Sequence, residues 1–266
     1  MKVTAATLFV LPAIELVFFV LAVTSFQETP VLSVLYLLAA AFFLCLSLHV
    51  TYHEVAHHCA RWGSKVQIPL GILLSLLMGV SFHAYRMGHF NHHRYNNRLE
   101  DFTSTWVQKS GQPVARNLLI YCLTWPRAFL FLLPQAKKVL QDGDAIPRDI
   151  LLCLVESGLL LLLIAGLFSY DWVVAIFYIE LAYIGWALIG LHNYGQHLPV
   201  KYGEFVATSY PATWYNRLLF NNGLHYEHHM HPAEPIAKLN ADPDAPMIRW
   251  PHFIVPLVSP NRFFEK

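Results

Sequence analysis

Long runs of apolar residues dominate the chain, and four of them are long enough to cross a bilayer as helices. They cover residues 5–26, 31–49, 150–168 and 172–191. About 20 apolar residues in helical form span the roughly 30 Å hydrocarbon core of a membrane. The runs at 68–82 and 118–133 are shorter, and the second of them contains Pro126 and Arg127. These two runs favour helices that lie in the interface or enter the membrane only in part.

The polar residues between the apolar runs predict how the chain is threaded. The connections 27–30 and 169–171 are short and contain no Lys or Arg, so the four runs form two tight hairpins. All 18 basic residues lie at the N-terminus, between the second and third runs, or after the fourth run. The positive-inside rule makes these three regions cytoplasmic. We therefore expect one multi-pass, all-α integral membrane domain over residues 1–266, with four transmembrane helices and a cytoplasmic helical cap made of 50–149 and 192–266.

Composition agrees with a membrane protein and argues against other classes. Hydrophobic residues make up 56% and charged residues 13% of the chain, against roughly 25% charged residues in soluble domains. The net charge of +1 gives no basis for nucleic-acid binding. Four cysteines, none of them in a CxxC pair, indicate reduced thiols that pack in the protein interior rather than a disulfide framework.

Ten of the 15 histidines fall into four short groups on the predicted cytoplasmic side. The groups are His53, His57 and His58 in HEVAHH; His89, His92 and His93 in HFNHH; His197 in NYGQH; and His225, His228 and His229 in HYEHH. Residues at i, i+3 and i+4 share a helix face, so each H-x-x-H-H motif is expected to present three imidazoles to one place. Imidazole binds Fe, Zn, Cu and Ni. Ten histidines exceed the four ligands of one structural zinc site and predict two metal ions with four or five ligands each.

The first group also permits a different interpretation. H-E-x-x-H is the signature of zinc metalloproteases, with His53 and His57 as ligands and Glu54 as general base. This alternative needs one further ligand and leaves seven grouped histidines without a role. A further alternative is a metal-binding or transport protein without oxidation chemistry. Such a transporter is expected to carry histidines along its spans, whereas the grouped histidines of this chain lie in the predicted cap.

The motifs HEVAHH, GHFNHHRYNN and LHYEHHMHP resemble the three histidine boxes of the membrane fatty acid desaturase superfamily, which also contains hydroxylases and ketolases. The resemblance extends from Thr51 to Pro232 and implies that the histidines of all four groups surround the metals. Some members space the first-box ligands as H-x-x-x-H, which selects His57, and others as H-x-x-x-x-H, which selects His58. Helix geometry favours His57, because it shares a face with His53.

This resemblance implies a non-haem di-iron oxidoreductase that uses O2 to desaturate a fatty acyl or related lipid chain. Hydroxylation or ketolation of a lipid, hydrocarbon or carotenoid on the same centre is the alternative. No cytochrome b5-like segment is present, so we expect a separate electron donor of the ferredoxin, cytochrome b5 or rubredoxin type. Asn193 and His197 match the N-x-x-x-H element of acyl-CoA desaturases, in which the histidine binds metal and the asparagine contacts it through water. No catalytic side chain beyond the metal centre is expected.

Four acidic residues complete the set of candidates. Asp101 follows the second box, where it is expected either to hydrogen-bond a ligand histidine or to cap a helix. Glu15, Glu156 and Glu180 lie inside predicted spans, where ionisable groups are costly and usually face the protein interior. We expect Glu180 to point inward, toward a polar group of the substrate or a neighbouring helix. For Glu15 and Glu156 we expect hydrogen bonds between helices.

Overall fold

The computed structural model describes residues 5–58, 63–130, 132–198, 202–204 and 206–258. The chain divides into two compact units. The helical unit comprises Thr4–Met87 and Phe129–Leu188, and the site unit comprises Gly88–Ala128 and Ile189–Lys266 together with Met1–Val3. Cys59 lies outside the described residues. The interpretation of residues 1–266 as one desaturase-like domain stays a prediction.

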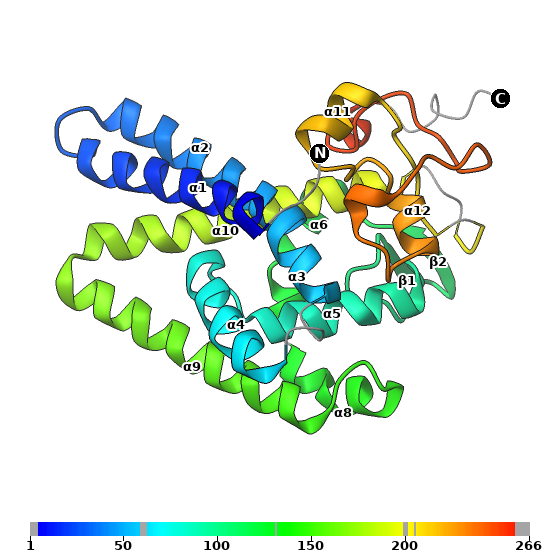
Figure 1. The fold of residues 1–266 in the computed structure, drawn as a ribbon, viewed down its shortest axis with the longest axis horizontal. Helices are drawn as coiled ribbons and strands as arrows, with labels where there is room; N and C mark the ends of the chain where they lie inside the picture. Colours follow the sequence, from blue (N-terminus) through cyan, green and yellow to red (C-terminus); the bar gives the residue numbers. More distant parts are fainter. Residues whose placement is uncertain (1–4, 59–62, 131, 199–201, 205, 259–266) are drawn as a thin grey trace. The chain divides into compact units, whose positions relative to one another are not determined.

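The helical unit begins with a hairpin of two apolar helices, α1 (Ala5–Ser25) and α2 (Pro30–Ser47), which lie side by side in Figure 1. The proline at the start of α2 suits the first turn, where its missing N–H leaves no hydrogen bond unmade. The Ser33 hydroxyl donates to the carbonyl oxygen of Ala22 at 2.6 Å and ties the two helices together.

The second helix continues without interruption into the first histidine box. A π-helical turn, η1 (Leu48–Tyr52), follows α2 and leads directly into α3 (His53–His58). Together they form one helical segment of 29 residues, Pro30–His58. The histidines of the first box are therefore fixed to the end of a long apolar helix rather than to a loop.

A second pair of long helices, α9 (Pro147–Tyr170) and α10 (Trp172–Gln196), is joined by a single residue. The carboxylate of Asp149 accepts the N–H of Ile146 at 3.0 Å and caps the start of α9. Three described helices are long and apolar enough to span a membrane: Pro30–His58, Pro147–Tyr170 and Trp172–Gln196. A shorter apolar helix covers Phe9–Ser25. The predicted apolar helices are therefore confirmed in place, while the arrangement as four spans stays a prediction.

In the sequence, α4 (Ser64–Met78) and α5 (Phe82–Tyr95) come between these two pairs of helices, and they meet at a bend of 92°. Gly79 ends α4 with φ +71°, a left-handed conformation that glycine adopts without steric cost. The bent pair has the form of a broken span or a re-entrant turn. The expectation that 68–82 enters the membrane only in part therefore stays a prediction.

The other elements are short. A two-stranded antiparallel hairpin pairs β1 (Trp106–Lys109) with β2 (Gln112–Ala115), and its turn has positive φ at Ser110 and Gly111, as two-residue hairpin turns require. The protein is predominantly helical as expected, but this hairpin was not predicted from the sequence. The remaining helices and 3₁₀ turns are α6 (Leu118–Thr124), α7 (Arg127–Leu130), α8 (Leu132–Asp142), α11 (Thr213–Leu218), α12 (His225–Met230), η3 (Ile236–Lys238) and η4 (Val255–Leu257).

Candidate metal centre

Helices α5 and α12 each carry an H-x-x-H-H motif, and each motif divides its histidines between two groups. The histidines at i and i+4 stay together, whereas the histidine at i+3 joins the other group. A helix turns by about 100° per residue, so positions i+3 and i+4 point in directions that differ by that angle. The expectation that each motif directs three imidazoles to one place is therefore wrong. Within the site unit, group A consists of His89, His93 and His228, and group B consists of His92, His197, His225 and His229.

Group B is a closed ring of four imidazole nitrogens, and all four side chains are buried. Taken around the ring from His92 through His197, His225 and His229 and back to His92, successive Nε2 atoms lie 3.1, 3.3, 3.1 and 3.2 Å apart. The centre of a flat ring with such edges lies about 2.3 Å from each nitrogen, near the roughly 2.0–2.1 Å of a zinc–imidazole bond, and puckering shortens that distance. The four nitrogens are therefore spaced as ligands of one ion.

Hydrogen bonds on the outer side of the rings fix which nitrogen faces the centre of group B. Nδ1 of His92 lies 2.6 Å from Oδ2 of Asp101, and Nδ1 of His197 lies 2.7 Å from the carbonyl oxygen of Val206. Both oxygens are acceptors, so each Nδ1 carries the proton and each Nε2 presents a lone pair inward. Lone pairs that face one another at this distance repel, and a cation between them removes the repulsion. The donor set therefore suits a metal ion.

The protonation states of group B also suit a metal ion. Burial, together with the neighbouring His92, lowers the pKa of His197 to about 3. Burial and then the adjacent His229 lower the pKa of His225 well below its usual value. Both rings are therefore neutral at pH 7, which is the form that binds metal.

Asp101 anchors His92 from the loop that follows α5. Its Oδ2 also accepts the N–H of Asn97 at 3.0 Å, and its Oδ1 accepts the N–H and the hydroxyl of Thr103 at 2.8 and 2.9 Å. Burial raises the pKa of Asp101, but His92 and the hydrogen bonds from Thr103 outweigh burial, so its pKa lies below the usual value. The ionised carboxylate orients the His92 ring and increases the basicity of its inner nitrogen.

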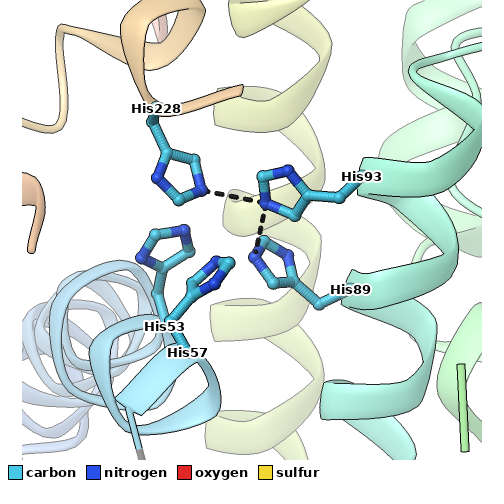
Figure 2. A group of neighbouring side chains, drawn as sticks. All are labelled: His53, His57, His89, His93 and His228. Atoms are coloured by element: carbon cyan, nitrogen blue, oxygen red, sulfur yellow. Dashed lines mark hydrogen bonds between the residues drawn. The ribbon is translucent and has the colours of Figure 1, made fainter. Parts of the chain in front are cut away.

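Group A brings together three nitrogens from the same two helices. Nε2 of His93 lies 3.1 Å from Nε2 of His89 and 2.9 Å from Nε2 of His228. Dashed lines mark these two contacts in Figure 2. All three offer a ligand atom within 4.8 Å of the others. Three imidazoles leave at least one coordination position of a metal ion open for a further ligand.

The first box separates its three histidines. His53 and His57 lie together on α3, with ring centroids 4.8 Å apart, and Figure 2 labels both. Nε2 of His58 instead lies 3.6 Å from Oε2 of Glu54, one turn earlier on the helix. Of the two spacings that the first box permits, the structure therefore favours the one with His57.

Asn193 reaches the loop that anchors group B through a tyrosine. Its Nδ2 donates to the hydroxyl of Tyr121 at 2.7 Å, and that hydroxyl donates to the carbonyl oxygen of Thr103 at 2.6 Å. Thr103 in turn hydrogen-bonds Asp101, the partner of His92. The structure thus gives Asn193 a role in holding the loop, and its expected contact to the metal through water stays a prediction.

Two further supporting residues were not identified from the sequence. Asn96 has φ +48°, a left-handed conformation that asparagine tolerates, and its Oδ1 lies 2.9 Å from Nδ1 of His229. Glu227, inside the third box, is buried and accepts the hydroxyl of Ser209 and the N–H of Asp242. The Asn-Asn dipeptide after the second box is a turn signal that would have indicated Asn96, whereas no spacing rule indicates the partners of Glu227.

Glu180 does not point inward as expected. Its side chain is exposed, whereas Tyr178 and Leu181 on the same helix are buried. Glu180 lies about 200° around the helix from Tyr178, because each residue advances the helix by about 100°. The expectation that Glu180 points inward is therefore wrong, while a contact of Glu180 with a substrate group stays a prediction.

Comparison with known families agrees with the geometry of the histidine groups. The family described as fatty acid desaturase matches residues 28–250. The matched region contains the first box and every histidine of groups A and B. No curated protein and no solved structure matches the chain.

Proposed function

Because the chain belongs to the fatty acid desaturase family, we propose that it introduces a double bond into a fatty acyl or related lipid chain, in an O2-dependent reaction at two iron ions. Its family and its histidine groups make it a membrane protein that modifies lipid with a metal cofactor. The observation that carries the proposal is group B, whose four buried Nε2 atoms converge while outer hydrogen bonds fix the tautomers of His92 and His197.

The proposal assigns nine of the ten grouped histidines to two irons. Group B holds one iron with four imidazoles. Group A holds the other with His53 and His57 of the first box, which gives five imidazoles. Two observations support this assignment: α3 presents His53 and His57 together, and the three nitrogens of group A leave coordination positions of one ion open. His58, which contacts Glu54, is left outside the ligand set.

The bound irons would supply the oxygen activation and C–H cleavage that no side chain performs. The reaction balances when O2 accepts two electrons and two protons from the substrate, two further electrons from a donor protein and two protons from the medium, and leaves as two water molecules. The donor would be a separate ferredoxin, cytochrome b5 or rubredoxin type of protein. The residues of this chain keep the imidazoles neutral, orient them through Asp101 and Val206, and shield the ligand atoms from water by burial.

We also propose that the chain crosses the membrane four times and that the metal centre lies on the cytoplasmic side. The support is the distribution of the 18 basic residues, which are absent from both hairpin connections. A glycosylation-site scan of the two connections tests this topology. Modification of sites introduced at 27–30 and 169–171, with none in the cap segments, is the expected result.

The zinc protease alternative finds less support. It requires the carboxylate of Glu54 to activate a water on a metal held by His53 and His57. That carboxylate instead lies 3.6 Å from His58, and the family match covers 223 residues, from 28 to 250, rather than the first box alone.

Metal analysis of the protein purified in mild detergent tests the proposed function. The parent is expected to bind about two irons per chain, and His228→Ala is expected to lose iron because it removes a ligand of group A. His231→Ala is the matched control, because His231 is exposed and lies just beyond α12. Product masses from a lipid and a reductant then identify the reaction: loss of two hydrogens supports desaturation, whereas gain of oxygen shows a hydroxylase or ketolase. One zinc per chain that survives His228→Ala but not His57→Ala would overturn the di-iron assignment.

A further inference from the structure

Side chains from three other helical segments satisfy the backbone groups at the bend between α4 and α5. At the end of α4, three carbonyl oxygens accept hydrogen bonds, each of 2.7 Å, from long side chains. The pairs are Leu76 with the Tyr178 hydroxyl, Met78 with the Trp186 indole N–H, and Val80 with the Tyr52 hydroxyl. A helix end leaves such carbonyls without helical partners, so these contacts satisfy three carbonyl groups at the bend.

The beginning of α5 is completed in the same way, with a carboxylate at its centre. Oε2 of Glu156 accepts the N–H of His83 at 3.0 Å and the hydroxyl of Ser81 at 2.7 Å. Oε1 of Glu156 lies 2.7 Å from Nδ1 of His83. The N–H of Phe82 donates to Oγ of Ser75 at 2.8 Å, and the N–H of Ala84 donates to Oγ of Ser81 at 3.0 Å. Glu156 therefore caps α5 from another helix.

This cap is buried and closely fitted. The exposed fractions of Glu156 and His83 are 1% and 0%. A Cβ on Gly71 of α4 would lie 2.9 Å from Oε1 of Glu156 and 3.3 Å from Cε1 of His83. Only a glycine at this position leaves room for the pair without displacement of either side chain.

The cap also lies far from the ends of the helices that supply it. Glu156 is nine residues beyond Pro147 at the start of α9, which corresponds to roughly 14 Å along the helix. Irregular backbone at membrane depth is tolerated only where protein groups satisfy it. The hydrogen bonds that these buried side chains supply to the bend fit a turn within the membrane rather than one at its surface.

We propose that Glu156 is a positioning residue for the metal centre. Its carboxylate, carried by the apolar helix α9, holds the start of α5 at a re-entrant turn and thereby sets where α5 presents His89, His92 and His93. This inference rests on the proposed di-iron function. It goes beyond that function because it assigns a task to a carboxylate that binds no metal and contacts no ligand histidine.

The physical link is the rigidity of α5. His83 and His89 are six residues apart on one continuous helix, roughly 9 Å along its axis. A negative charge at the start of a helix is favourable, because the N-terminus carries a partial positive charge. Without the carboxylate, the start of α5 is free to shift and the second-box imidazoles move with it. A displacement of about 1 Å at a reacting centre costs about 100-fold in rate.

Three variants test this role. Glu156→Leu removes the cap and is expected to lower kcat about 100-fold, with KM unchanged and an altered absorption and Mössbauer signature of the bound iron. Glu156→Gln keeps a carbonyl oxygen for the N–H of His83 and an amide for its ring, so it should restore most of the kcat. Glu15→Leu is the matched control, because Glu15 is also a buried carboxyl residue in an apolar helix of the same unit, and it should leave the iron signature unchanged.

The outcomes separate failure of this inference from failure of the proposed function. A parent protein without iron would overturn the proposed function and this inference with it. A parent with two irons, and a folded Glu156→Leu variant with the parental iron signature and kcat, would overturn the inference alone. If Glu156→Leu does not fold, the comparison of Glu156→Gln with Glu156→Asp decides. Glu156→Asp shortens the side chain and withdraws it from His83. Equal kcat values and equal iron signatures in these two variants would refute the positioning role.

Discussion

Replacement of Asp101 by asparagine changes one oxygen into an NH2 group at a position where all the neighbours are hydrogen-bond donors. Oδ2 accepts from Nδ1 of His92 and the N–H of Asn97, and Oδ1 accepts from the N–H and hydroxyl of Thr103. An amide cannot accept at both positions. With its NH2 group toward Thr103 it meets a backbone N–H, and with its NH2 group toward His92 it forces the proton of that ring onto Nε2.

The expected cost follows from these contacts. A buried donor left without its acceptor costs about 1–3 kcal/mol of stability. Loss of a residue that orients a metal-binding histidine typically costs 10–100-fold in metal affinity. We therefore expect Asp101→Asn to bind iron about 10–100-fold more weakly than the parent, with a larger loss in group B than in group A.

Competition between the purified protein and a chelator of known affinity measures this change at constant pH. Glu100→Gln is the matched control, because Glu100 is the neighbouring acidic residue and is exposed; it should bind iron as the parent does. The reasoning would be refuted if Asp101→Asn bound iron with parental affinity while Glu100→Gln behaved in the same way.

Three further predictions concern other parts of the centre. His57→Ala should remove about one iron per chain and His58→Ala none, by metal analysis; equal losses would contradict the assignment of His57. Gly195→Ala places a methyl group against the carbonyl oxygen of His252 and should cost about 1–3 kcal/mol through overpacking, seen as a lower Tm in detergent; an unchanged Tm would contradict this close approach. The metal-free protein should lose stability as the pH falls from 6.5 toward 3, because in that range His197 is protonated in the unfolded chain and neutral in the fold. Each such histidine contributes a slope of about 1.4 kcal/mol per pH unit, so a Tm that stays constant from pH 6.5 to 4 would disprove the effect.

The sequence predicted well the elements that can be recognised from the length of an apolar run or from the spacing of histidines alone. An apolar run of about 20 residues predicts a long helix whatever its neighbours are, and α2, α9 and α10 are found where these runs lie. The histidine motifs likewise identify the residues of groups A and B, because the spacing of the motifs is local. Asp101 was a candidate because it follows the second box closely.

The elements that the sequence predicted poorly depend on direction. A helix that is apolar on every side gives no periodic signal for its buried face, so the exposure of Glu180 could not be deduced from its neighbours. To predict that each H-x-x-H-H motif is divided between two groups, one must know which residues lie on both sides of the helix. The path from Asn193 through Tyr121 to the Asp101 loop joins segments 72 residues apart in the chain, and no spacing rule connects them.

The division of each motif between groups A and B has a thermodynamic consequence for how the centre fills. Both α5 and α12 carry histidines of both groups, so an ion bound in one group would restrain the two helices that supply most histidines of the other. The second site is then already ordered, so binding of the second ion loses less conformational entropy and is tighter than binding of the first. Two-site linkage of this kind is reciprocal. Titration with iron should therefore pass directly from the empty to the doubly loaded protein, with little of the singly loaded form at any point.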